Sequence, residues 1–167
     1  SEQTFIFDDI PAEPVPSLLR QFSAPIRITT EQSDAALLML MGCDDDAFVA
    51  WDAAQHLLAR SIESLGREPS ETPEAVNPEL AQACERVLTG AMDPAMKALT
   101  VTLPSEEYLA DRAAQKGLVD VAANHARRQQ MKALLGSRLS EHWQQVSLQY
   151  QLQGSYRASA DDIGVRA

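Results

Sequence analysis

The stretch Ala47–Leu65 constrains the fold more than any other part of the sequence. Apolar residues recur in it every three or four positions, which predicts a helix with one continuous apolar face. The residues of this face are Phe48, Trp51, Ala54, Leu58, Ile62 and Leu65. A second apolar strip beside the first is formed by Ala50, Ala53 and Leu57. A helix with so broad an apolar face needs packed neighbours on more than one side, so the rest of the chain must supply them.

Polar residues mark the start and the opposite face of this helix. Asp44, Asp45 and Asp46 directly precede it, where carboxylates cap free N–H groups and meet the positive end of the helix dipole. A calcium loop would need alternating ligands, a central glycine and a final Glu, and this run is not followed by them. We expect the remaining face, which carries charges of both signs, to stay in water. Its residues are Asp52, His56, Arg60, Glu63 and Arg67.

The sequence after residue 30 carries helix signals throughout. Five positions have residue types that cap helix N-termini, namely Ser33, Asn77, Asp93, Ser105 and Asp120. The predicted helices cover 33–42, 77–90, 93–99, 105–109 and 120–135, with Gly42 and Gly136 as stop signals. Another helix is predicted at 139–150, closed by Gly154, and the first two turns of a last one at 161–165.

The N-terminal segment has a different pattern. Residues 4–7 and 26–29 are β-branched, aromatic or alternating runs that predict two short strands. Pro11, Pro14 and Pro16 exclude regular structure between them, apart from one helical turn at Ser17–Arg20. Two strands cannot form a domain of their own. We therefore expect either that they pair with each other on the helical body, or that they are the last strands of a sheet that is missing here.

These elements together predict a mainly α fold. We expect irregular stacked antiparallel helix pairs of the HEAT or armadillo type, preceded by a short β segment. The helix predicted to begin at Asp161 has only about two turns in this sequence, which is below the length at which an isolated helix is stable. Ser1 leads straight into a strand. We therefore expect an excised piece of a longer protein, whose exposed apolar face promotes self-association.

Charge and composition exclude several classes of partner. The formal net charge is −10, and residues 1–104 hold 17 acidic and 6 basic residues, which argues against nucleic-acid binding. A mildly basic run has no aromatic residues among its members, so we interpret it as a solvated face. Its residues are Arg112, Lys116, Arg127, Arg128, Lys132 and Arg138. No apolar run approaches the ~20 residues of a membrane helix. Two unspaced cysteines, Cys43 and Cys84, without an export signal favour a reducing cytoplasm.

Catalytic and metal-binding motifs are absent from the sequence. It has no phosphate loop, no Gly-rich dinucleotide turn and no Gly-x-Ser-x-Gly. None of the histidines, His56, His125 and His142, belongs to an H-E-x-x-H motif, and we interpret each as a helix-surface histidine. Asp52 and His56 lie one turn apart and are read as a surface pair. Cys84 is in register with apolar residues and is predicted to be buried. We predict no catalytic, cofactor-binding or metal-binding residue in this chain.

Several stretches resemble the zinc-dependent aminopeptidase N family of bacterial metallopeptidases. Residues 14–25, PVPSLLRQFSAP, resemble the segment that links the small β-sandwich domain to the C-terminal helical domain of that family. Residues 48–55, FVAWDAAQ, are similar to its F-x-R-W-[DE]-A-x-Q helix, with Ala50 in place of the usual Arg. Further similarities occur at Asp93-Pro94-Ala95, at Leu103–Glu106, at Tyr156-Arg157 and at Asp161–Ile163. They follow the family's order along nearly the whole chain.

The resemblance implies a division of the chain into residues 1–29, the end of the β-sandwich domain and linker, and residues 30–167, the first part of the helical domain. It implies a parent hydrolase that removes single N-terminal residues from peptides, using zinc held by two His and a Glu. Those ligands lie in upstream domains, so this fragment would hold no zinc. Its partners would be the catalytic and β-sandwich domains of the same parent, with peptide substrates reached through the parent. It would cover the catalytic domain and limit access. The alternative is a free-standing helical-repeat adaptor, with polar caps at both ends of an intact stack.

Overall fold

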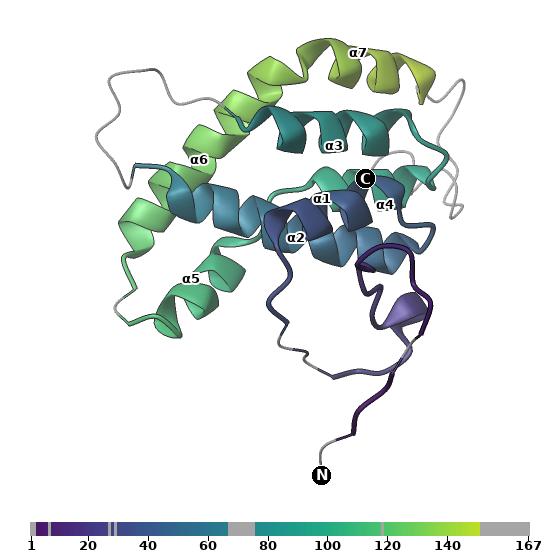
Figure 1. The fold of residues 1–167 in the computed structure, drawn as a ribbon. Helices are drawn as coiled ribbons and strands as arrows, with labels where there is room; N and C mark the ends of the chain where they lie inside the picture. The colour runs from purple at the N-terminus through teal and green to yellow at the C-terminus, as the bar shows by residue number, and fades with distance from the viewer. Residues whose placement is uncertain are drawn as a thin grey trace.

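Seven α-helices and one short 3-10 helix, η1, make up the regular structure of the residues described in a computed structural model (Figure 1). The described residues are 3–6, 8–26, 28, 30–66, 76–117 and 119–150. In chain order the elements are η1 (Arg20–Phe22), α1 (Asp34–Cys43), α2 (Ala47–Ser64), α3 (Pro78–Thr89), α4 (Pro94–Val101), α5 (Glu106–Ala114), α6 (Val121–Arg138) and α7 (Ser140–Gln149).

Helix α2 is the central element, as its broad apolar face predicted. It packs against α1, α4 and α6, and η1 also lies against it. Figure 1 shows α2 running through the middle of the structure with α6 crossing it. Ala54, Leu58 and Ala59 have no exposed surface. Alanines on this helix let neighbouring helices approach closely, and the larger Leu and Ile side chains fill the space between them.

The remaining helices extend this centre into a stack. Helix α3 packs on α1 and α4, and α7 lies against α3 on the side away from α2 (Figure 1). Helix α5 packs against α6. Helix α3 buries an apolar face that includes Cys84 at 1% exposure. The mainly α, stacked-helix fold predicted from the sequence is confirmed, and within the described ranges no helix is long and apolar enough to cross a membrane.

The predicted N-caps are confirmed. The side chains of Ser33, Asn77, Asp93, Ser105 and Asp120 each accept a hydrogen bond from a backbone N–H in the first turn of α1, α3, α4, α5 and α6 respectively. Asn77 and Asp93 are followed by Pro78 and Pro94 at the first helical position, where the missing N–H has no partner to lose. The helix starts are therefore determined by local sequence.

The two predicted strands are not present in the described residues. Thr4–Ile6, Ile26 and Ile28 lie in no strand, although Phe7, Arg27 and Thr29 fall outside the described residues. Phe5, Ile6 and Ile26 are 69%, 80% and 59% exposed. A strand needs a neighbour to complete its hydrogen bonds, and the described residues of the two runs form no ladder with each other. The single helical turn predicted at Ser17–Arg20 occurs slightly later, as η1.

Gly136 does not end a helix, contrary to the prediction. Helix α6 continues through it to Arg138, and α7 starts at Ser140. Glycine inside a helix costs only about 1 kcal/mol relative to alanine. Burial of Leu135 and Leu139, which are 6% and 1% exposed, favours the helical path across this position by more than that. The signals at Gly154 and at 161–165 lie outside the described residues.

Glu63 joins α2 to α5 through two basic residues. Its carboxylate accepts hydrogen bonds from Arg112 Nε at 2.7 Å and Lys116 Nζ at 2.6 Å. The side chains of Glu63 and Arg112 are 18% and 19% exposed. Burial would raise the pKa of Glu63, but the hydrogen bonds and charges of Arg112 and Lys116 outweigh burial, so the pKa lies below its ordinary value.

Replacing Glu63 with Gln should therefore lower the free energy of unfolding by about 1–2 kcal/mol near pH 7, because two charge-assisted hydrogen bonds are weakened. A lowered folded-state pKa means that the carboxylate contributes fully above its ordinary pKa of 4.5 and loses its contribution as the pH falls through the folded value. Urea unfolding of both proteins from near pH 7 down to about pH 3.5 should show a shrinking difference. The exposed Glu107→Gln is the matched control. An equal difference across the pH range would contradict the assignment.

Candidate domain interface

The segment that precedes α1 is attached to the helical body by Arg20. The Arg20 guanidinium donates to Asp44 Oδ1 at 3.0 Å, to Asp45 Oδ1 at 2.5 Å and to the Ser17 hydroxyl at 3.1 Å. The hydrogen bond to Asp45 and the charges of the aspartates raise the pKa of Arg20, and the same hydrogen bond lowers the pKa of Asp45. One side chain thus joins the segment to the loop between α1 and α2. We call this group the Arg20 clamp.

Asp46 provides a second attachment of the N-terminal segment to the start of α2. Its Oδ1 accepts from the backbone N–H groups of Phe48 and Val49 at 3.0 and 3.1 Å, which caps α2 as predicted. Its Oδ2 accepts from the backbone N–H of Gln21 at 2.7 Å. The residue is only 8% exposed. A single carboxylate therefore fixes the start of the central helix and the position of η1 together.

Aromatic rings continue this attachment. The Phe22 and Phe48 rings meet edge to face with their centroids 5.1 Å apart, and the Phe48 and Trp51 rings lie 5.6 Å apart. Rings at these distances and angles attract each other beyond the area that they bury. Through Phe22, the segment therefore also contacts the first turn of α2.

The backbone of η1 is held in an unusual conformation. Leu19, Gln21 and Phe22 have φ values of 53°, 55° and 51°, in the left-handed region that side chains with a Cβ rarely adopt. Such residues persist where surrounding contacts determine the path of the chain. Here these contacts are the Arg20 clamp, the Asp46 hydrogen bond to Gln21 and the Phe22 ring contact.

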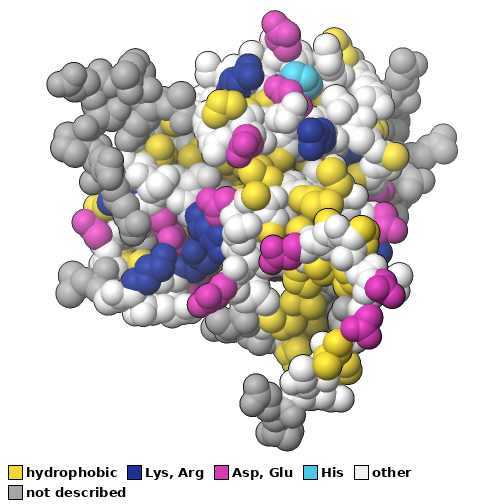
Figure 2. Space-filling view, in the orientation of Figure 1, with side chains coloured by type: hydrophobic (Ala, Val, Ile, Leu, Met, Phe, Trp, Pro, Cys, Tyr) yellow, Lys and Arg dark blue, Asp and Glu magenta, His cyan; other side chains and the backbone are white. Residues whose placement is uncertain are grey.

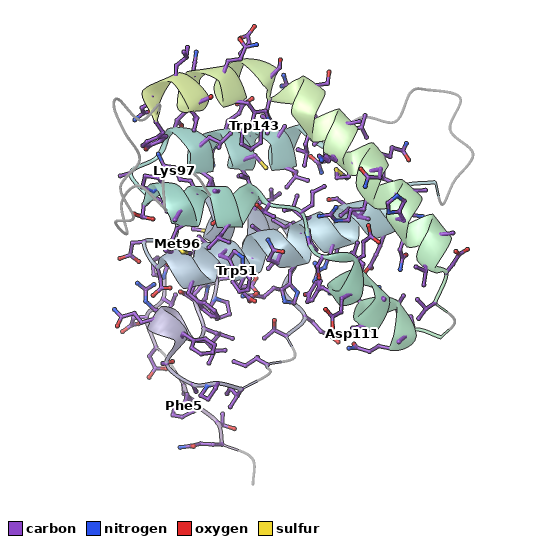
Figure 3. All side chains as sticks on the ribbon, turned by 180° about the vertical axis from the view of Figure 1, so that it is seen from behind. Phe5, Trp51, Met96, Lys97, Asp111 and Trp143 are labelled. Carbon is purple, nitrogen blue, oxygen red and sulfur yellow. The ribbon has the colours of Figure 1, made fainter. Side chains whose placement is uncertain are left out.

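The segment packs Val15 against the core and leaves several of its other apolar side chains exposed. Phe5, Ile6, Ile10 and Ile26 are 44–80% exposed, and Ile28 is 37% exposed. Figure 3 places Phe5 at the far end of this segment, and hydrophobic side chains show along its surface in Figure 2. A contiguous apolar surface on an extended segment is the usual mark of a face that another part of a protein covers. This segment, residues 3–28 as described, is the candidate domain interface.

The polar face of α2 lies only partly in water, whereas the whole face was predicted to stay there. Arg60 donates to the Gln32 carbonyl at 3.0 Å and pairs with Asp34 at the start of α1. Glu63 is half-buried against α5, as described above. His56 lies half-buried beside a cavity of about 50 Å³ that residues of the N-terminal segment also line. Arg60 and Glu63 can be partly buried because each has an oppositely charged partner and their aliphatic stems pack on apolar surface.

Asp52 and His56 are placed as the predicted surface pair. His56 Nε2 lies 3.9 Å from Asp52 Oδ1. Burial lowers the pKa of His56, Asp52 opposes this, and the charges of Arg112 and Arg60 lower it further. The cavity beside the pair has room for little more than water, so the structure offers no space there for a substrate.

The other candidate residues lie apart from one another. His125 Nδ1 is 2.8 Å from Glu106 Oε1, an exposed contact between α6 and α5, and His142 is half-buried on α7. Cys43 is exposed, whereas burial raises the pKa of Cys84 to about 12, so its thiol stays protonated. The described ranges contain no group of three His, Cys, Asp or Glu side chains that could hold a metal ion. These residues do not fit a zinc site.

The Arg20 clamp was missed by the sequence interpretation, which assigned the three aspartates to helix capping alone. One signal was present: Arg20 is the only basic residue among the first 26, and the run Asp44–Asp46 is the densest acidic cluster in the chain. A pairing across 24 residues cannot be derived from local spacing, because it depends on how the loop folds back.

Comparisons with known proteins give matches along the whole chain. A family model described as "Domain of unknown function (DUF3458_C) ARM repeats" matches residues 34–167, and one described as "Domain of unknown function (DUF3458) Ig-like fold" matches residues 1–31. Aminopeptidase N from Escherichia coli (strain K12) is 33% identical over 168 residues, which cover 99% of this chain. Aminopeptidase N from Caulobacter vibrioides is 34% identical over 168 residues and covers 100% of the chain.

A solved structure agrees with these relatives. The crystal structure of Legionella pneumophila aminopeptidase A in complex with aspartic acid matches 96% of this chain with a TM-score of 0.76 and 25% sequence identity. The chain spans 19% of the length of each of these three proteins. The resemblance inferred from the sequence is confirmed. The chain belongs to the family of DUF3458_C ARM-repeat domains, related over its whole length to a segment of bacterial aminopeptidase N.

Proposed function

We propose that this chain is a non-catalytic, C-terminal portion of a cytoplasmic zinc aminopeptidase that removes single N-terminal residues from peptides. The observation that carries the proposal is the match of nearly the whole chain, at 29–34% identity, to one fifth of several proteins named aminopeptidase N. In this proposal the catalytic and β-sandwich domains of the same parent are its partners, and peptide substrates are bound by the parent. The proposal includes neither nucleic acid nor membrane as a partner.

The proposed domain division places residues 1–29 at the end of a β-sandwich domain with its linker and residues 30–167 in the helical domain. Family matches that end at residue 31 and begin at residue 34 support this division. So does the change from extended chain to helix at the Ser33 N-cap. The exposed Phe5, Ile6 and Ile26 then belong to strands that would be paired and covered in the parent.

The proposed role of the helical part is to cover the catalytic domain and limit access to it. The Arg20 clamp and the Asp46 hydrogen bond to Gln21 support this role, because a cover must keep a fixed orientation relative to the domain that precedes it. Zinc, which activates the attacking water in such enzymes, would be held by upstream residues. The chain would therefore contribute shape and orientation, and no chemical step.

Complementation tests this proposal. The upstream part of the same reading frame, ended before Ser1 and loaded with zinc, should bind this chain. Binding should change the ratio of hydrolysis rates between a long peptide and a small alanyl chromogenic substrate, because a cover restricts the larger substrate. Absence of an H-E-x-x-H motif upstream, or neither binding nor a changed ratio, would contradict the proposal and favour the adaptor alternative.

A matched pair of variants locates the contact. Phe5 and Leu148 are 69% and 68% exposed on opposite parts of the chain. Phe5→Ser should weaken binding to the upstream part, because it removes an apolar side chain from the proposed sheet, whereas Leu148→Ser should leave binding unchanged. Equal effects of the two changes would place the interface elsewhere.

Arg20→Ala should release η1 from the body. The left-handed turn at Leu19–Phe22 would lose the contacts that oppose its strain, so the Gln21 amide should exchange with deuterium several-fold faster. Arg138→Ala, at the exposed end of α6, is the control and should leave this amide protected. The clamp should also weaken in the wild type as the pH falls through the lowered pKa of Asp45, because protonation removes its charge. Unchanged Gln21 exchange in Arg20→Ala would show that the clamp does not hold the turn.

The chain should self-associate when it is separated from its proposed partners. Exposed apolar side chains on the N-terminal segment and at Leu99, Val121 and Leu148 provide surface for this association. Sedimentation velocity should give a weight-average coefficient that rises with concentration, and a Phe5→Ser/Ile6→Ser double variant should reduce the rise. A strictly monomeric chain over a wide concentration range would be the opposite result.

A further inference from the structure

A second hollow lies between α3, α6, α7 and the end of α4, and none of its described lining residues belongs to the N-terminal segment. Its volume is about 410 Å³, within the range of roughly 300–1,000 Å³ typical of small-molecule sites. Cys84, Leu135 and Leu139 line it and are 1–6% exposed, so its floor is apolar and firmly packed. Trp143 adds an aromatic wall, and Figure 3 shows it between α7 and α3.

Two basic side chains of α6, Arg128 and Lys132, line the same hollow. They are four residues apart and therefore neighbours on one face of the helix. Neither Arg128 nor Lys132 has an ion pair to any described residue, which is also true of Arg86, Lys97, Arg127 and Arg138. What distinguishes Arg128 and Lys132 is that both line an apolar hollow.

The Arg128 guanidinium is held in place by the backbone. Its Nε donates to the Pro104 carbonyl at 2.7 Å and its Nη2 to the Leu103 carbonyl at 3.4 Å. Leu103 also lines the hollow, so these bonds fix a cationic group next to it. A guanidinium fixed in this way has less conformational freedom left to lose when it binds an anion than a mobile side chain has.

Gly136 continues the stripe of Arg128 and Lys132 by one more turn and also lines the hollow. A Cβ added at this position would meet no atom within 4 Å, so packing does not require glycine there. Glycine is also less favourable than alanine inside a helix. Its effect on the hollow is to leave space beside Lys132, which makes it a place where a larger side chain could block entry without disturbing the core.

We propose that this hollow binds a small aliphatic carboxylate, with the chain length of a medium-chain fatty acid. The hydrocarbon body would lie on Cys84, Leu135 and Leu139, and the carboxylate would meet Arg128 and Lys132. The described residues that line the hollow include no acidic side chain that could pair with an ammonium group, so free amino acids fit less well. This site is separate from the proposed domain interface and does not rest on the proposed aminopeptidase role.

Titration with decanoate tests the site, with Trp143 fluorescence as the readout. In a Trp51→Phe background Trp143 is the only tryptophan, because the chain has two. Decanoate, below its micelle concentration, should change the fluorescence saturably and bind about tenfold more tightly than decanol, since only the acid can form charge-assisted hydrogen bonds. Equal affinity for acid and alcohol, or no saturable change with either, would overturn the proposal.

Three variants locate the binding. Lys132→Met should weaken decanoate binding about tenfold and leave decanol unchanged, because Lys132 is exposed and its loss removes one charge-assisted contact. Gly136→Leu should weaken both ligands by filling the hollow, whereas Gly136→Ala, which folds without strain, should bind as the wild type does. Arg138→Met is the matched charge control and should have no effect. Binding that survives both Lys132→Met and Gly136→Leu would place the ligand elsewhere and overturn the assignment.

Discussion

The packing of α2 on several sides is the constraint on which the rest of the structure depends. Helices α1, α4 and α6 pack against it, and each buries apolar side chains that α2 alone could not shield. A buried Leu or Ile contributes about 1.5–3 kcal/mol, and Leu57, Leu58 and Ile62 are all at most 4% exposed. Most of the stability of a helix in a protein comes from the packing of its apolar face and less from its intrinsic helix propensity. The stack is therefore assembled around α2, and its neighbours owe their positions to that face.

The polar edge of the same helix attaches the peripheral elements. Arg60 reaches Asp34 at the start of α1, Glu63 reaches α5, and Asp46 at the N-cap holds η1. Exposed ion pairs contribute little stability on average. Their value here is directional, because a hydrogen bond between fixed groups sets an orientation that apolar contact alone leaves free. The apolar face of α2 thus holds the helices of the stack together, and its polar edge sets the orientation of α1, α5 and η1.

Local sequence patterns were enough to predict the helical part of the fold. Caps such as Ser33 and Asn77 and the periodicity of α2 act over three or four residues, which is the range that a sequence pattern records. The contacts that were missed act over longer distances. Arg20 meets Asp44 and Asp45 only after the chain folds back, and whether Gly136 ends a helix depends on what Leu135 and Leu139 pack against. The prediction of two strands was wrong for a related reason, because a strand forms only when a second strand completes its hydrogen bonds.

The two unfilled surfaces of the described chain differ in the kind of partner that they can accept. Phe5, Ile6 and Ile26 lie on extended backbone outside any ladder, so a partner must supply hydrogen bonds as well as apolar area, which another strand does. The hollow beside Trp143 is lined mainly by helices, whose backbone groups are already hydrogen-bonded, and by Thr102 and Leu103 after α4. Among its described lining residues only Arg128 and Lys132 are charged, and a single small anion can contact both. The two surfaces therefore differ less in their hydrophobicity than in whether their backbone N–H and C=O groups already have hydrogen-bond partners.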